Sequence, residues 1–162
     1  MDQSSGSGMQ GRGRIGSTPY AAAHALALRW HAGQTDKGGA PYLRHLEQVA
    51  ANLLARWPDA TAAQVQAALL HDVLEDTDCP PEEVEAIGPD VLAIVRALTK
   101  PAGAVYLDYV RALSASGNVS AMRVKLADLQ SNCDPARAWP GQAELIDRKY
   151  APARAILEAA LR

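Results

Sequence analysis

Residues that bind divalent metals interrupt an apolar helical pattern in the middle of the chain. Val65, Ala68 and Leu69 lie at i, i+3 and i+4 of one helical stripe, and the next position of that stripe, i+7, is Asp72. His71 directly precedes this aspartate. An inward-facing carboxylate needs a partner, because burying an unpaired charge is costly, and an adjacent imidazole makes a metal ion an attractive partner. The doublet therefore indicates a metal site.

Two further segments place ligand-type residues on apolar helix faces. His45 leads a stripe that Val49 and Leu53 continue, and Asp128 follows two apolar residues at i−7 and i−4. Together with the doublet, three segments would bring two imidazoles and two carboxylates to one interior. This mixed nitrogen and oxygen set suits manganese, iron, zinc or another borderline divalent metal, and it suits a thiolate-selective metal poorly.

Each of these residues also has a purely structural interpretation. A single inward-facing histidine is more often a hydrogen-bonded core residue than a ligand, and Asp128 has Lys125 and Arg123 nearby in sequence as ion-pair partners. The metal site is favoured because four such residues coincide on the inward faces of three helices.

The elements that must position these side chains all read as helices, with little strand-like alternation. The first is expected from Ser17 or Thr18, either of which can cap it, to about Gly33. Pro, Gly and Asp mark most of the junctions that follow. Further helices are expected at about residues 43–57, 61–75, 81–87, 89–99, 105–115, 119–133 and 142–161. The sequence therefore predicts an all-α fold of about eight helices.

The composition indicates one ordinary globular domain. The chain has 162 residues, of which 48% are hydrophobic and 21% charged, and its net charge of −2 gives no general attraction to nucleic acid. Apolar segments are too short to cross a membrane, and no export signal opens the chain, so a cytoplasmic location is expected. Cys79 and Cys133 are then expected to be free thiols.

The first residues differ from the rest of the chain. Residues 1–16 are rich in Gly and Ser and have no apolar period, so they are expected to be disordered; with Met9 inside them, the first eight residues also fit a remnant of an expression vector. The folded domain is expected to span residues 17–162, without an internal repeat or a second domain.

Five separated motifs resemble a known family. They are His31-Ala32-Gly33-Gln34, Lys37-Gly38-Gly39-Ala40-Pro41-Tyr42, His45 with Val49-Ala50, the run from Leu69 to Thr77, and Val124-Lys125-Leu126-Ala127-Asp128 with Asn132. Their order and spacing resemble the HD-domain metal-dependent phosphohydrolases. Within these, the chain is most similar to the hydrolase domain of RelA/SpoT-type proteins and especially to the single-domain small alarmone hydrolases. The resemblance covers about residues 20–132 and continues more weakly to Tyr150.

The resemblance implies an HD-domain helical bundle around a central metal site, with His45, His71, Asp72 and Asp128 as the ligands. It implies hydrolysis of guanosine 3′,5′-bis(diphosphate) (ppGpp) or its pentaphosphate at the 3′ position, giving GDP or GTP and pyrophosphate. The implied cofactor is Mn²⁺, with Zn²⁺, Fe²⁺ or Co²⁺ as alternatives. No synthetase domain follows, so a hydrolase-only activity is expected from a monomer or homodimer, with neither nucleic acid nor membrane as a partner.

Two acids follow the doublet by one helical turn. Glu75 lies at i+4 from His71, and Asp76 lies at i+4 from Asp72, so both carboxylates are expected beside the metal, where they would orient or deprotonate a water. The alternative is a solvated helix end. Acids at a helix C-terminus oppose the helix dipole, which favours the catalytic interpretation.

The resemblance also implies four substrate contacts, at Lys37, Lys125, Asn132 and Tyr150. Asp36 departs from the family, which often has an arginine there, and an acid cannot supply the planar cation that stacks on guanine. Two alternatives therefore stay open. One is an HD phosphatase acting on another nucleotide, for example one that removes the 2′ phosphate of NADPH. The other is a catalytically silent nucleotide-binding regulator.

Overall fold

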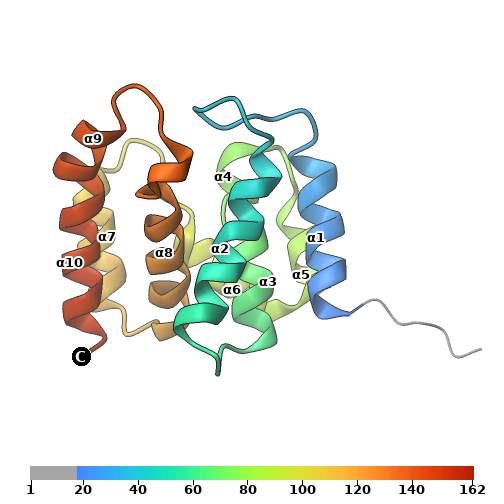
Figure 1. Cartoon of the computed structure of the whole chain (residues 1–162). Helices are drawn as coiled ribbons and strands as arrows, with labels where there is room; N and C mark the ends of the chain where they lie inside the picture. Colours follow the sequence, from blue (N-terminus) through green and yellow to red (C-terminus); the bar gives the residue numbers. More distant parts are fainter. Residues whose placement is uncertain (1–17) are drawn as a thin grey trace, which may run out of the picture.

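The computed structural model describes residues 18–162, and these residues fold into a helical bundle (Figure 1). Within this range the only β-type pairing is an isolated bridge between Thr35 and Pro41. The helices are α1 (Pro19–Trp30), α2 (Tyr42–Arg56), α3 (Ala62–Leu70), α4 (Val73–Asp76), α5 (Pro81–Ile87), α6 (Pro89–Leu98), α7 (Tyr106–Ala115), α8 (Val119–Asn132), α9 (Gln142–Leu145) and α10 (Ala151–Ala160). The prediction of an all-α fold is confirmed. The prediction for residues 1–16 lies outside the described residues.

Three helices form the centre of the bundle. Helix α3 packs against both α2 and α8, and α2 and α8 also pack against each other. Helices α1 and α5 lie on one side of this centre, and α7 and α10 lie on the other (Figure 1). The largest fully buried side chains include Leu46 and Leu53 of α2, Leu69 of α3 and Leu126 of α8. The helices predicted to carry the ligand residues are therefore the ones that share the core.

Local sequence explains where several helices begin. The Thr18 hydroxyl accepts a hydrogen bond from Ala21 N, 3.2 Å away, and caps α1. Thr61 and Gln64 form a reciprocal capping box at the start of α3. Asn118 caps α8 through Ala121 N at 3.0 Å. These caps fix the start of each helix and hence the rotation of its residues about the axis.

The predicted helix over residues 61–75 is interrupted in the structure. Helix α3 ends at Leu70, and α4 begins at Val73. His71 Nδ1 lies 2.7 Å from the Ala68 carbonyl oxygen, which is the acceptor that Asp72 N–H would use in a continuous helix. The imidazole thus replaces one backbone bond, and the chain turns at the His-Asp doublet.

The last predicted helix also has an irregular part. Between α9 and α10, residues Ile146–Tyr150 form a π-helix, which is rare and occurs mostly as single turns near functional sites. A short 3₁₀ turn, Pro135–Arg137, follows α8. No helix within residues 18–162 is long and apolar enough to cross a lipid bilayer.

Candidate metal centre and active site

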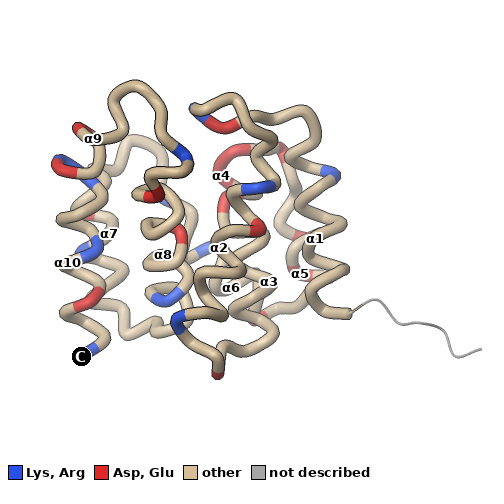
Figure 2. The backbone as a smooth tube through the Cα atoms, viewed as in Figure 1, with Lys and Arg blue, Asp and Glu red and all other residues tan. Residues whose placement is uncertain are grey.

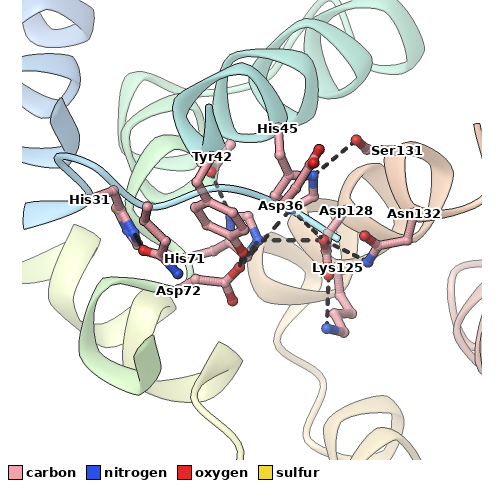
Figure 3. A network of polar contacts seen from close by, with 12 residues as sticks. His31, Asp36, Tyr42, His45, His71, Asp72, Lys125, Asp128, Ser131 and Asn132 are labelled. Atoms are coloured by element: carbon pink, nitrogen blue, oxygen red, sulfur yellow. Dashed lines mark hydrogen bonds and ion pairs between the residues drawn. The ribbon is translucent and has the colours of Figure 1, made fainter. Parts of the chain in front are cut away.

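Three buried side chains from three helices converge at the centre of the bundle. They are His45 of α2, His71 at the end of α3 and Asp128 of α8, with exposed fractions of 2%, 2% and 3%. One ligand-type atom from each lies within 4.8 Å of the other two. Figure 3 shows these side chains pointing toward one another. A divalent ion could contact all three at once.

A fourth side chain, the carboxylate of Asp72, borders the same space. Asp128 Oδ1 lies 3.2 Å from His45 Nε2 and 3.4 Å from His71 Nε2. Asp72 Oδ2 lies 3.0 Å from His71 Nε2 and 4.0 Å from His45 Nε2. The turn at the doublet therefore brings both of its side chains to the same point, which two adjacent residues of a regular helix cannot do.

The His71 imidazole is oriented as a ligand. His71 Nδ1 faces the Ala68 carbonyl oxygen, so in the neutral ring the proton lies on Nδ1, and Nε2 can then offer its lone pair to an ion. This Nε2 is buried and has no hydrogen-bond partner among residues 18–162. A buried nitrogen that has no hydrogen-bond partner and faces two carboxylates is suited to bind a metal ion. His45 Nδ1 lies 3.0 Å from Ser131 Oγ and 2.8 Å from an Arg137 guanidinium nitrogen.

Electrostatics keeps the carboxylates in their charged form. Burial alone would raise the pKa of Asp128, but the Lys125 ammonium, 2.9 Å away, and His71 hold this pKa well below its ordinary value. Burial likewise opposes the charge on Asp72, and His71 keeps its pKa low. Tyr42 Oη donates a hydrogen bond to Asp72 Oδ2. Both carboxylates are thus available as anionic ligands.

This centre opens into a pocket of about 340 Å³. Its lining includes ten side chains from the predicted site and its surroundings: Lys37, His45, Asp72, Glu75, Asp76, Lys125, Asp128, Asn132, Lys149 and Tyr150. Acidic residues of α4 lie at the pocket end of the bundle, as Figure 2 shows. The pocket therefore joins a negative metal cradle to several cations.

The two acids of α4 have different surroundings. Burial, together with the nearby Asp72 and Glu75 carboxylates, raises the pKa of Asp76 to about 6. Glu75 Oε1 instead accepts a hydrogen bond from Lys100 N at 2.7 Å. A carboxyl group that titrates near neutral pH can exchange a proton with a water, whereas a carboxylate held by a backbone N–H is better suited to orienting one.

Cations gather on the opposite wall of the pocket. Lys149 Nζ lies 4.3 Å from the centroid of the Tyr106 ring, and Lys125 Nζ lies 5.6 Å from it. Burial lowers the pKa of Lys149, and the charges of Lys125, Lys37 and Lys100 lower it further. Ammonium groups that repel one another in a pocket are stabilised by an anionic ligand, so this wall suits phosphate groups.

Asp36 does not face the pocket as a free acid. Its Oδ1 accepts hydrogen bonds from Gly38 N at 2.9 Å and Ala40 N at 3.0 Å, and its Oδ2 lies 3.3 Å from Arg137 Nη2. The carboxylate therefore closes the loop before α2 and pairs with a cation from a segment 101 residues later. Arg137 therefore balances the negative charge of Asp36.

A profile of the HD domain family matches residues 23–131, which is more than half of the chain. This chain belongs to the HD domain family. The matched range contains all four metal-type side chains and both acids of α4.

Named relatives and a solved structure refine this assignment. The GTP pyrophosphokinase rsh of Brucella ovis is 34% identical over 120 residues, covering 68% of this chain and 16% of that protein. The guanosine-3′,5′-bis(diphosphate) 3′-pyrophosphohydrolase MESH1 of Drosophila melanogaster is 34% identical over 103 residues, covering 63% of this chain and 58% of that protein. A solved structure of a metazoan ortholog of SpoT that hydrolyzes ppGpp superposes with a TM-score of 0.64 at 26% identity, covering 92% of this chain and 97% of that one.

The HD-domain structure brings all ten predicted site residues toward one pocket, except that His71 lies just behind its lining. Two of the predicted substrate contacts do more than line it: Lys125 and Asn132 both contact the Asp128 carboxylate, at 2.9 Å and 3.1 Å. Sequence reasoning did not assign a site role to seven further lining residues: Thr35, Asp36, Tyr42, Tyr106, Arg137, Trp139 and Lys149. Most of these lie in loops or irregular turns, where no periodicity marks an inward-facing position.

Proposed function

We propose that this HD-domain protein is a metal-dependent hydrolase of ppGpp and its pentaphosphate, acting at the 3′ position with Mn²⁺ as its ion. One observation carries the proposal: a buried His45, His71 and Asp128 cluster opens into a pocket that carries acids on one wall and lysines on another. The names of the fly hydrolase and the superposed SpoT ortholog support this substrate. The ion's identity, a cytoplasmic location and the choice between monomer and homodimer stay predictions.

The reaction consumes one water. The phosphorus–oxygen bond at the ribose 3′ oxygen breaks, the water oxygen joins the departing pyrophosphate, and the 3′ oxygen takes a proton to become a hydroxyl. A bound divalent ion would supply a water of lowered pKa and would polarise a phosphoryl oxygen. Asp76 would accept the proton of the water, and Glu75, fixed by Lys100 N, would orient that water.

The other residues would hold the substrate and the cradle. Lys125 pairs with Asp128 at 2.9 Å and would balance charge as phosphates enter. Lys37 and Asn132 line the same pocket and would contact the nucleotide, with Tyr150 closing one side. These roles account for a pocket that has carboxylates on one wall and lysines on another: the carboxylates would hold the ion, and the lysines would hold the phosphates.

A side-by-side assay tests the proposal. Purified protein loaded with Mn²⁺ is incubated with ppGpp, GTP and NADPH, and products are separated by anion-exchange chromatography. We expect GDP and pyrophosphate from ppGpp, and turnover of the other two at least about 100-fold slower. Faster release of phosphate from NADPH or GTP would reject the substrate. If the protein binds these nucleotides but hydrolyses none of the three, the proposal that it is a hydrolase would be rejected.

Matched variants separate the ion from the chemistry. Asp128→Asn is expected to lose bound metal, measured by plasma mass spectrometry, and activity together. Glu75→Gln and Asp76→Asn are expected to keep the metal while the rate falls about 10²- to 10⁴-fold. Asp78→Asn, an exposed acid that does not line the pocket, is the control and should match the wild type. Full activity in Asp76→Asn and Glu75→Gln would contradict the assignment of the acids.

A further inference from the structure

The segment after α8 forms part of the pocket wall through Arg137 and Trp139. The Asp134 carboxylate accepts a hydrogen bond from Ala136 N at 2.9 Å and starts the 3₁₀ turn Pro135–Arg137. Trp139 follows two residues after this turn, and its carbonyl oxygen accepts a hydrogen bond from Gln142 N at 3.1 Å. Its indole lines the main pocket and also a second cavity behind it, which Glu144 and Arg148 line. The Trp139 side chain is half-buried, so part of it stays accessible beside the pocket.

Arg137 fixes this segment. Its Nη2 lies 3.3 Å from Asp36 Oδ2, and its Nη1 lies 2.9 Å from Ser131 Oγ and 2.8 Å from His45 Nδ1. A Cβ built on Gly38 would lie 3.7 Å from the Ala138 carbonyl oxygen, so the loop before α2 also runs close to this backbone. The Arg137 guanidinium already contacts these protein groups. The Trp139 indole is therefore the side chain of this segment that a ligand can contact.

One contact shows that the indole face is reachable from the pocket. Lys37 Nζ lies over the Trp139 ring, 5.5 Å from its centroid, and the Lys37 side chain is exposed and long. A lysine held there only by a cation–π contact is easily displaced, since such contacts at exposed sites are weak. A planar ligand can therefore take its place on the ring while Lys37 turns to the ligand's polar edge.

The other aromatic rings of the pocket are already engaged. Lys149 and Lys125 both lie against Tyr106. Tyr42 donates its hydroxyl to Asp72, and Tyr150 is only 9% exposed. Trp139 offers the largest ring among them and, unlike Tyr150, is not fully buried.

We propose that the indole of Trp139 is the stacking surface for the purine base of the substrate, a role that rests on the proposed nucleotide hydrolysis. The base would lie against Trp139 at the rim, and the phosphates would extend inward to the lysine wall. Aromatic rings bind bases through their π faces without reading base identity, so the expected preference is for purines over pyrimidines. Asp36 and Arg137 then serve as positioning residues for this ring, where a family arginine would contact the base itself.

Tryptophan fluorescence tests the contact without turnover. The chain has three tryptophans, and Trp30 and Trp57 do not line the pocket. In protein stripped of metal with EDTA, ppGpp should quench the emission of a Trp30→Phe/Trp57→Phe variant in a saturable way. It should leave the emission of Trp139→Phe unchanged. Quenching that persists in Trp139→Phe, or that is absent in the double variant although ppGpp binds by calorimetry, would overturn the proposal.

Kinetics provides a second readout. With ppGpp, Trp139→Ala should raise KM about 5- to 100-fold while kcat changes less than about twofold, because base stacking is a binding interaction shared by substrate and transition state. Trp139→Phe keeps a stacking ring and should recover most of the loss. A fall in kcat with KM unchanged, or equal KM values in Trp139→Ala and wild type, would contradict the stacking role.

Failure of this inference is distinguishable from failure of the proposed function. If the wild type does not hydrolyse ppGpp, the function is wrong, and the fluorescence experiment alone decides whether Trp139 stacks on a base. If the wild type hydrolyses ppGpp and the Trp139 variants behave as wild type in both experiments, the function stands and the stacking role is rejected. The melting temperature of Trp139→Phe, expected to equal that of the wild type, guards against a folding defect.

Discussion

Asp76 and Glu75 are adjacent in sequence, yet the fold gives their carboxyl groups different surroundings. Asp76 lies at i+4 from Asp72 and receives its negative field, while Glu75 is tied to Lys100 N on the neighbouring loop. The raised pKa of Asp76, about 6, means that its charge is maintained at neutral pH against burial and repulsion. A carboxylate held under these conditions lowers the stability of the folded protein.

We therefore expect Asp76→Asn to stabilise the metal-free protein at pH 7.5. The folded protein holds a proton on Asp76 up to about pH 6, whereas the unfolded chain releases it near pH 4, so wild-type stability falls between these values as pH rises. The neutral amide removes this loss. Urea unfolding in EDTA at pH 7.5 and pH 4 should show a gain for Asp76→Asn at the higher pH that disappears at the lower one.

Asp78→Asn is the matched control for this experiment, because Asp78 is an exposed acid on the same segment outside the pocket. It should change stability little at either pH. A gain for Asp76→Asn that is equally large at pH 4 would contradict the raised pKa.

The sequence predicted the metal-type residues better than the rest of the pocket, and the reason is physical. His45 and Asp128 interrupt apolar stripes of long helices, so their inward direction follows from the helical period. Arg137 and Trp139 lie in a turn and a loop, whose direction is set by a partner a hundred residues away. Local patterns carry no information about such a contact.

At the scale of elements, the pocket rim consists of two loops joined by one ion pair. The loop before α2 carries Asp36, the turn after α8 carries Arg137, and both lie at the same end of the bundle in Figure 1. The side chains of Asp36 and Arg137 are only 8% and 17% exposed, so water screens the pair less than it screens a surface ion pair.

A double-mutant cycle measures this link. We expect Asp36→Asn and Arg137→Gln to couple by about 1–2 kcal/mol in the free energy of unfolding, because the charge pair is partly buried. Asparagine keeps the oxygen that accepts the Gly38 and Ala40 N–H groups, so the loop itself should persist. The measurement is urea unfolding of the four proteins without metal.

The control is the exposed pair of Glu144 and Arg148, 3.8 Å apart with side chains 73% and 70% exposed. Its cycle with Glu144→Gln and Arg148→Gln should give a coupling near zero. Equal coupling energies in the two cycles would mean that the rim pair is no more than a surface contact.

Helix boundaries show a similar division between local and tertiary causes. Thr61 and Gln64 predict the start of α3 from sequence, since a capping box is a local signal. The end of α3 has no glycine or proline to mark it, because a side chain, His71, takes the backbone acceptor there. The π-helix at Ile146–Tyr150 is likewise unmarked in the sequence.

At the scale of the whole molecule, the metal centre joins helices that are far apart in sequence. His45, His71 and Asp128 belong to α2, α3 and α8, which pack on one another around the core. At this junction the negative charge of Asp128 opposes that of Asp72, so a cation bound between them is favoured. An ion bound there stabilises the folded state and has no equivalent site in the unfolded chain.

Mn²⁺ is therefore expected to raise the melting temperature of the wild type. An ion at about 100 times its Kd adds about 2.7 kcal/mol, which corresponds to a rise of about 5–10 °C for a domain of this size. In Asp128→Asn the same addition should raise it by less than about 2 °C. Differential scanning calorimetry of each protein, with EDTA and with Mn²⁺, measures the change against its own baseline. An equal rise in both proteins would place the ion elsewhere.

At His71, the side-chain orientation suited to a metal ligand and a continuous helix require the same backbone acceptor. The imidazole that is aligned as a ligand is aligned by taking the Ala68 carbonyl oxygen from the helix. In a variant without this histidine, the Ala68 carbonyl oxygen would be free to accept the backbone bond from Asp72 N–H, and α3 could continue into α4.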